Sequence, residues 1–201
     1  MAIAMSATFG AIGQNVMDVN TKKLGAPIQS TMYGIFFEDI NYAADGGLYG
    51  ELVKNRSFEF PQHLMGWQSF GSVEVKNDGP VERCPHYVVL SDPGHNDRRS
   101  GLVNEGYFGI GVKKGEEYCF SVWAKVEGQG AGSKEQATIR VQLIQENSME
   151  ENQQFVEEKL DITSAEWKKY TVKLTSTKTL KHAKLRIFLA NSQQLTAKSH
   201  A

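Results

Sequence analysis

The sequence predicts a mainly β protein, an antiparallel jelly-roll β-sandwich preceded by a single strand and helix. Two observations support this prediction. From about residue 60 to residue 190, apolar residues alternate with polar ones in separate runs, and clusters of Gly, Asn, Asp and Ser divide these runs. Before residue 60, one continuous apolar run is followed by a helical spacing of apolar residues. The chain therefore divides into zones of different secondary structure.

The chain begins with a small, apolar and uncharged stretch over residues 1–13. This stretch resembles the hydrophobic part and cleavage region of a signal peptide, although a basic leading region is missing. We expect a signal-peptide remnant here, with a disordered apolar tail or a short buried strand as the alternatives. A remnant of this kind predicts a periplasmic or secreted protein.

Residues 14–60 are expected to hold a strand, a loop and a helix. A short strand-like run covers residues 16–19, and residues 32–40 contain consecutive apolar residues at 35–37. A continuous apolar run suits a strand buried on both faces, as in a parallel sheet. Asp45 is a candidate N-cap for a following helix. The residues that would share one face of that helix are Leu48, Leu52 and Val53.

Residues 61–190 are expected to form the sandwich. Alternation of apolar and polar side chains predicts half-buried strands, each with one face toward a core. The predicted strands cover residues 118–126, 139–143, 170–174 and 185–189. Several such strands separated by turn residues are typical of an antiparallel sandwich. The tail, residues 191–201, is polar and has no period, so we expect it to be disordered.

Composition bears on the possible partners and cofactors. The chain has 22 Lys and Arg against 23 Asp and Glu, so nothing favours a nucleic acid or an anionic membrane as partner. No apolar run reaches the ~18 residues of a membrane-spanning helix. The five histidines form no ligand pair, and Cys84 and Cys119 fit no metal spacing. We expect no metal and no cofactor, and whether the two cysteines pair stays open.

One block of the sequence resembles a known family. Residues 33–59 read YGIFFEDINYAADGGLYGELVKNRSFE, which closely resembles the opening of the family-fifty-one glycoside hydrolases, best known as α-L-arabinofuranosidases. The resemblance implies that this block is the first strand and helix of a (β/α)8 barrel. In one branch of that family a carbohydrate-binding-like sandwich follows. Gly66, Trp67 and the run 115–125 resemble the jelly-roll carbohydrate-binding modules of families four and nine.

The resemblance implies an incomplete retaining glycosidase. A (β/α)8 barrel needs roughly 250 residues, and the family's acid/base and nucleophile glutamates lie on later barrel strands. We therefore expect an N-terminal fragment of an α-L-arabinofuranosidase with no catalytic residue, inactive alone, whose ligand is an arabinose-containing oligo- or polysaccharide. The alternatives are a stand-alone carbohydrate-binding module and a purely structural sandwich. An exposed barrel remnant also predicts self-association.

The resemblance implies one substrate-binding residue, Glu38. It is expected at the C-terminal end of the first barrel strand, where its carboxylate would accept hydrogen bonds from arabinose hydroxyls. The pair Asn104 and Glu105 looks like the Asn-Glu pair that carries the acid/base in many barrel glycosidases. It lies between sandwich strands, so we expect no catalytic role for it. Nearby residues that are weaker candidates for substrate binding are Asp39, Asn41 and Asp45.

The sandwich offers its own candidates for sugar binding. Aromatic rings cover the apolar faces of a sugar, while amide and charged groups bind its hydroxyls. For tryptophans at strand entries we expect mainly structural roles at the edge of the core. The turn-rich acidic loop at residues 92–97 matches no strict calcium loop, so we expect a turn there. The aromatic candidates are Trp67, Tyr107, Trp123 and Trp167, and the polar candidates are Arg140, Gln142 and Arg186.

Overall fold

The computed structural model describes residues 17–34, 38–91, 99–127, 136–145, 154–190 and 195–199, the last group by backbone alone. The chain divides into two units, Met1–Phe37 and Glu38–Ala201. In the first unit, the described residues 17–34 are all exposed, and the short 3-10 helix η1 (Ser30–Met32) is their regular element. The signal-peptide prediction for residues 1–13 lies outside the described residues.

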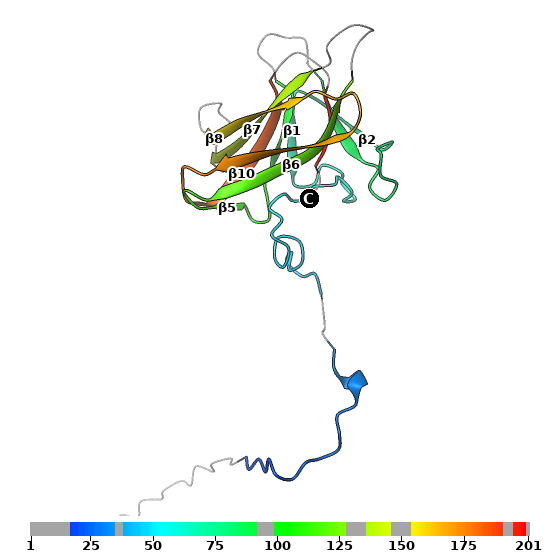
Figure 1. The fold of residues 1–201 in the computed structure, drawn as a ribbon, viewed down its shortest axis with the longest axis vertical. Helices are drawn as coiled ribbons and strands as arrows, with labels where there is room; N and C mark the ends of the chain where they lie inside the picture. Colours follow the sequence, from blue (N-terminus) through cyan, green and yellow to red (C-terminus); the bar gives the residue numbers. More distant parts are fainter. Residues whose placement is uncertain are drawn as a thin grey trace, which may run out of the picture. The chain divides into compact units, whose positions relative to one another are not determined.

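The second unit is a sandwich of two antiparallel sheets, as the sequence predicts (Figure 1). The first sheet has the order β1-β4-β10-β7-β8, with β5 paired to β10, and the second has the order β2-β3-β11-β6-β9. Most neighbours within a sheet are not consecutive along the chain, as expected for a jelly roll. The strands of the first sheet are β1 (Trp67–Phe70), β4 (Gly101–Asn104), β5 (Ile110–Val112), β7 (Ala137–Gln145), β8 (Gln154–Ile162) and β10 (Leu180–Leu189). Those of the second are β2 (Ser72–Lys76), β3 (Tyr87–Ser91), β6 (Glu117–Val126), β9 (Lys168–Thr175) and β11 (Leu195–Ser199).

Alternating side chains build the core between the two sheets. Along β6, the side chains of Phe120, Val122, Ala124 and Val126 are buried, and the residues between them are partly exposed. Successive side chains of a strand point to opposite faces, so one apolar face of β6 meets the other sheet. The four strands predicted from the period of two are confirmed as β6, β7, β9 and β10.

Two strands of the second sheet, β3 and β11, were not predicted from the sequence. In β3, residues 87–90 are all buried, so both faces are covered and no polar residue alternates. The prediction of a disordered tail is wrong for residues 195–199. They form β11, where Ala197 lies opposite both Val88 and Ala124. Residues 191–194 and 200–201 lie outside the described part of the chain.

The strand and helix predicted within residues 14–60 are wrong wherever the structure describes them. Residues 17–19, 32–34 and 38–40 form no strand. Residues 45–56 form turns, irregular backbone and an isolated bridge between Asp45 and Tyr49 instead of a helix. The apolar residues 35–37 lie outside the description. Gly46, at φ +83°, follows Asp45 directly, and glycine disfavours a helix interior. Leu48, predicted to share one face of the helix with Leu52 and Val53, is 76% exposed.

The segment before β1 is part of the sandwich, which places its boundary earlier than residue 61. Phe58 is 1% exposed, and its ring centroid lies 5.4 Å from that of Trp67. The Trp67 indole Nε1 donates a hydrogen bond to the Asn55 carbonyl at 3.0 Å. The Asn55 Nδ2 in turn donates to the carbonyls of His63 and Met65. The segment 55–65 is therefore fixed to the core that it covers.

The structure answers two further questions from the sequence. Cys84, in the loop before β3, and Cys119, on β6, are both free thiols. Among the described residues, no helix has the length and apolar character needed to cross a membrane.

Candidate functional site

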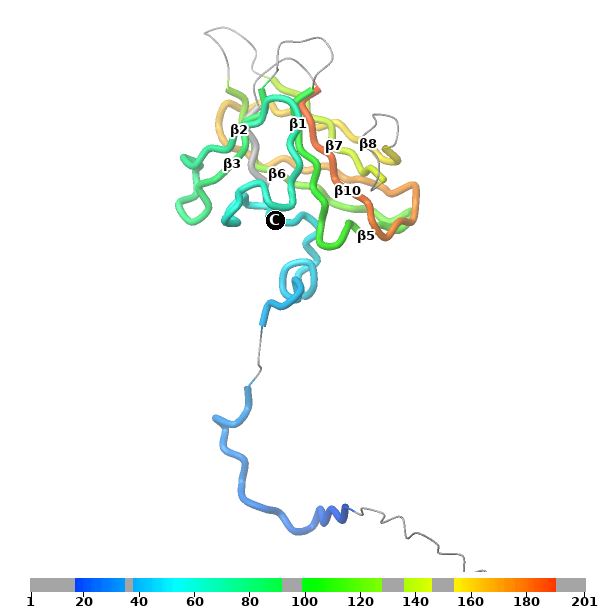
Figure 2. Tube along the Cα trace, turned by 180° about the vertical axis from the view of Figure 1, so that it is seen from behind, coloured from blue at the N-terminus to red at the C-terminus, as the bar shows by residue number. Residues whose placement is uncertain are grey.

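The register of the first sheet aligns a row of five residues across five strands. Gln68 lies opposite Val103, Val103 opposite Arg186, Arg186 opposite Gln142, and Gln142 opposite Glu157. Their neighbours in sequence, such as Leu102 and Leu185, belong to the core, so this row lies on the other face of the sheet. We call these five residues the polar row. Figure 2 shows the strands that carry it side by side.

Hydrogen bonds connect three residues of the polar row, Arg186, Gln142 and Glu157, into one network. Arg186 Nε donates to Gln142 Oε1 at 2.7 Å, and Gln142 Nε2 donates to Glu157 Oε2. Arg140 Nη1, on the same face of β7 as Gln142, donates to Glu157 Oε1 at 2.6 Å. Both carboxylate oxygens of Glu157 are therefore held by donors from β7.

The residues of this sheet face differ in how far they are buried. Gln142 is 2% exposed and Arg186 is 7% exposed. The side chains of Arg140 and Glu157 are 33% and 22% exposed, and Gln68 is exposed. Buried polar groups are costly unless they are hydrogen-bonded, so the Arg186–Gln142 bond fixes the orientation of the outer groups.

A second row of residues on the same face adds apolar contacts. Phe70 lies opposite Gly101, Gly101 opposite Phe188, and Phe188 opposite Arg140. A side chain at Gly101 would collide with both phenylalanines, so glycine permits their close approach. The guanidinium carbon of Arg99 lies 5.1 Å from the centroid of the buried Phe188 ring. The face therefore combines hydrogen-bond donors, a carboxylate acceptor and the half-buried ring of Phe70.

The predicted aromatic candidates do not gather on this face. Trp67 lies in the core, and Trp123 lies on the outer face of the second sheet, opposite Lys198 and Lys169. The ring centroid of Trp167 lies 5.2 Å from that of Tyr87, edge to face. Tyr107 follows β4 and contacts Tyr42, with ring centroids 5.1 Å apart.

The predicted polar candidates Arg140, Gln142 and Arg186 do come together. Sequence reasoning missed Glu157 and Gln68, which complete the face. Glu157 lies in β8, whose apolar and polar residues do not alternate regularly, and only the register of β7 with β8 places it beside Gln142. No local pattern in the sequence carries that information.

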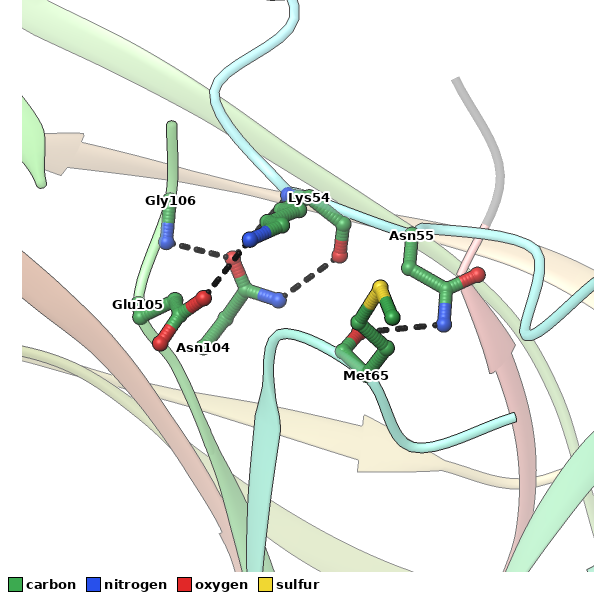
Figure 3. A network of polar contacts seen from close by, with 6 residues as sticks. All are labelled: Lys54, Asn55, Met65, Asn104, Glu105 and Gly106. Carbon is green, nitrogen blue, oxygen red and sulfur yellow. Dashed lines mark hydrogen bonds and ion pairs between the residues drawn. The ribbon is translucent and has the colours of Figure 1, made fainter. Parts of the chain in front are cut away.

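Asn104 and Glu105 hold the segment around Lys54 to the sandwich (Figure 3). The buried Asn104 side chain accepts from the Lys54 and Gly106 backbone N–H groups and donates to the Lys54 carbonyl. Lys54 Nζ lies 2.8 Å from Glu105 Oε1, and this hydrogen bond raises the pKa of Lys54. All of the polar atoms of the Asn104 side chain therefore serve the fold.

Glu38 is exposed in irregular backbone at the start of the second unit. Its neighbour Asp39 accepts a hydrogen bond from the Ala44 N–H at 2.9 Å. Asp45 caps no helix, and its Oδ1 lies 3.8 Å from Arg56 Nη1. The structure brings no member of the polar row to this segment. The acidic loop at residues 92–97 lies outside the described residues.

A cavity of about 490 Å³ is lined in part by residues 49–53 and Arg56. Its walls are mainly apolar residues of β5, β6 and neighbouring strands, with Glu51, Arg56 and Glu117 as charged groups. This cavity shares no lining residue with the polar row. The cavity and the sheet face are thus separate features of the second unit.

Comparison with known proteins matches residues 50–194 to a family described as a carbohydrate binding domain, CBM_4_9. An extracellular exo-α-L-arabinofuranosidase of Streptomyces chartreusis is 36% identical over 201 residues, which cover 93% of this chain and 22% of that protein. A probable α-L-arabinofuranosidase A of Aspergillus oryzae is 32% identical over 136 residues, covering 66% of this chain and 20% of that protein.

A solved structure shares the fold. The arabinose-bound α-L-arabinofuranosidase MgGH51 matches with a TM-score of 0.68 and 24% identity, over 83% of this chain and 28% of that one. The chain spans about a fifth of the length of the two curated relatives described above.

Proposed function

The chain belongs to the carbohydrate binding domain family matched over residues 50–194, and we propose that its sandwich binds arabinose-containing plant polysaccharide as a module of an α-L-arabinofuranosidase. The observation that carries the binding site is the hydrogen-bonded polar row with Arg140 on one sheet face. The arabinofuranosidase names of the relatives support the choice of sugar.

The proposed contacts follow from the chemistry of the exposed groups. A sugar hydroxyl both donates and accepts hydrogen bonds, so it can bind beside the Arg140–Glu157 ion pair, where it accepts from a guanidinium N–H and donates to a carboxylate oxygen. Gln68 adds an amide at the other end of the row, and the Phe70 ring covers apolar C–H groups. Because Gln142 and Arg186 are already fixed, little side-chain freedom is lost on binding.

Hydrolysis is proposed to require more than this chain. A retaining glycosidase needs two carboxyl groups about 5–5.5 Å apart, one as acid/base and one as nucleophile. We assign neither role to a residue here and keep Glu38 as the residue that would hold arabinose hydroxyls in a complete enzyme. Release of the aryl group from an aryl arabinofuranoside by the chain alone would contradict this assignment.

We further propose that the protein acts outside the cytoplasm and associates with itself. The extracellular Streptomyces relative supports the location. Exposed apolar side chains of the second unit support association, because apolar patches on a protein surface favour contacts with other molecules. These side chains are Ile40, Leu48, Tyr49 and Phe108, which are 55%, 76%, 66% and 71% exposed.

Affinity electrophoresis tests the proposed function. We expect the folded chain to migrate more slowly in native gels that contain arabinoxylan or arabinan than in gels without polysaccharide. Unchanged migration in both polysaccharides would overturn the binding function and favour a purely structural sandwich. A gel with a soluble cellulose derivative, which carries no arabinose, serves as the control for nonspecific retardation.

A further inference from the structure

We propose that the cavity lined by residues 49–53 and Arg56 binds a neutral phenol, separately from the polar row. Its volume of about 490 Å³ lies within the range of small-molecule sites, which is about 300–1,000 Å³. Such sites combine mainly apolar walls with a few polar groups that orient the ligand. The cavity has both parts, and each part indicates one end of the ligand.

Most of the cavity wall is apolar and shielded from bulk water. Six of the lining side chains belong to the core and are 2–5% exposed, namely Ile110, Val112, Phe120, Leu143, Leu174 and Leu185. The half-buried Tyr118 lines the cavity next to them. Removal of apolar surface from water is favourable, and the rings of Phe120 and Tyr118 favour edge or offset contacts with a further ring. The wall therefore suits an aromatic body.

The part of the wall formed by residues 49–53 is held in place at both ends. The Tyr49 N–H donates a hydrogen bond to the Ala44 carbonyl at 2.9 Å. Directly after the segment, the Lys54 N–H donates to Asn104 Oδ1 at 3.0 Å, and the Lys54 carbonyl accepts from Asn104 Nδ2 at 2.9 Å. A wall that is already ordered loses little freedom when a ligand binds.

Arg56 and Glu51 provide a hydrogen-bond donor and an acceptor at the cavity. Arg56 Nε lies 3.9 Å from Glu51 Oε2, and Arg56 Nη1 lies 3.8 Å from Asp45 Oδ1. Both distances exceed the roughly 2.7–3.2 Å of an N–H···O hydrogen bond, so these contacts are ion pairs only. A guanidinium has several N–H donors, and those of Arg56 form no hydrogen bond within the described part of the chain. Donors therefore remain for a ligand.

The two groups together favour a hydroxyl over other oxygen groups. A hydroxyl beside them can accept from an Arg56 N–H and donate to Glu51 Oε2, whereas a carbonyl can only accept. Charge disfavours an anionic ligand, because Glu51 and Asp45 together outnumber Arg56. The third lining carboxylate, Glu117, is offset by Lys173 at 2.8 Å. An aromatic ring with a neutral hydroxyl, a phenol, matches both the wall and the polar pair.

Isothermal titration of the full chain with 4-propylphenol tests the site. We expect one equivalent to bind with a Kd of about 0.1–1 mM, as is ordinary for a ligand of this size. The methyl ether of this phenol has no hydroxyl hydrogen to donate, and 4-propylbenzoate is an anion. Both are expected to bind about tenfold more weakly. In two-dimensional NMR spectra, the amide signals that shift on binding should come from residues 49–53 and 117–121, which line the cavity.

Two variants test the two parts of the cavity. Arg56→Leu is expected to lower the affinity for 4-propylphenol about tenfold, because it removes a charged hydrogen-bond donor. Leu52→Trp, at a lining side chain that is 36% exposed, is expected to fill the cavity and abolish binding. The matched control is Arg83→Leu, which removes an exposed arginine outside the cavity lining and should keep the wild-type affinity. If Arg56→Leu fails to fold, the phenol and its methyl ether test the same hydrogen bonds on the wild type.

Three results would overturn the proposal. They are the absence of 4-propylphenol binding to the wild type, equal affinities for the phenol and its methyl ether, and shifted amide signals outside residues 49–53 and 117–121. Tighter binding of N-acetyltyrosine amide than of 4-propylphenol would also overturn it, because the cavity would then suit a tyrosine side chain of a polypeptide. None of these results depends on whether the polar row binds sugar, since the cavity shares no lining residue with that row.

Discussion

The buried side chain of Asn104 forms two hydrogen bonds with the backbone of Lys54. Asn104 Oδ1 accepts from the Lys54 N–H at 3.0 Å, and Asn104 Nδ2 donates to the Lys54 carbonyl at 2.9 Å. Asn104 is 0% exposed. The Asn104 side chain thus pairs with the Lys54 backbone as a neighbouring strand would. It fixes the segment around Lys54, which is distant in sequence, to the end of β4.

Asn104→Ala is expected to lower the free energy of unfolding by about 2–3 kcal/mol, because it leaves buried backbone groups without partners. Glu105→Gln is the control, since it removes only an ion pair whose glutamate side chain is 54% exposed. That change should cost less than about 1 kcal/mol. Urea unfolding measures the free energy of unfolding of both variants. Equal losses in the two variants would contradict a stabilising role for the hydrogen bonds between Asn104 and the Lys54 backbone.

Phe58→Ala is expected to destabilise the sandwich by about 3–5 kcal/mol, as for other buried phenylalanines. The reason is that Phe58, although it precedes β1, is 1% exposed and packs against Trp67. Leu48→Ala, at a side chain 76% exposed, should change stability by less than about 0.5 kcal/mol. If thermal unfolding of the Phe58 variant matched that of the Leu48 variant, the segment before β1 would lie outside the core.

Tyr87→Phe is expected to flatten the pH dependence of stability at both extremes. The Tyr87 hydroxyl donates to Asp78 Oδ1 at 2.7 Å, which lowers the pKa of Asp78 below its usual 3.8. A lowered pKa stabilises the fold above pH 3.8, and this contribution is lost as the pH falls through the folded-state pKa.

At alkaline pH the sign is reversed. Burial, followed by the hydrogen bond to Asp78, raises the pKa of Tyr87 above its usual 10.0. The neutral hydroxyl therefore stabilises the fold below pH 10.0, and stability falls as the pH rises toward the folded-state value. Urea unfolding across this pH range should show both slopes in the wild type and weaker slopes in Tyr87→Phe. Identical profiles would contradict the pairing.

Phe108→Ser together with Leu48→Ser is expected to reduce self-association. Phe108 and Leu48 are 71% and 76% exposed, and their removal from the surface lowers the gain from burying apolar area between molecules. Sedimentation velocity at increasing protein concentration measures the change. The proposed association fails if the wild type remains monomeric, or if the double variant associates as strongly as the wild type.

The fold could be predicted where one face of a strand meets water. β6 alternates buried and partly exposed residues, and its period was visible in the sequence. β3 is buried on both faces, so its apolar run lacks any period. The helical spacing of apolar residues around Leu48 predicted a helix that the structure lacks. Gly46 has a φ of +83°, a left-handed backbone conformation that interrupts a helix, and the spacing of apolar residues does not reveal such a conformation.

The site could be predicted only in part. Arg140 and Gln142 lie two residues apart on one strand, so their shared face follows from the period of two. Glu157 joins them through the register of β7 with β8, and Arg186 through the register of β10 with β7. Such registers arise from long-range pairing, which no local pattern encodes.

The central claim is that the face carrying the polar row binds arabinose-containing polysaccharide. Isothermal titration of wild type, Arg140→Ala and Lys173→Ala with arabinoxylan oligosaccharides tests it most directly. Lys173 lies on the second sheet and pairs with Glu117 at 2.8 Å, with its own side chain 68% exposed, so its variant is a matched loss of one cation. We predict binding by the wild type and the Lys173 variant, and a loss of about tenfold or more in Arg140→Ala, as expected for a charged hydrogen bond. Equal affinities in all three proteins, with unfolding midpoints unchanged, would contradict the claim.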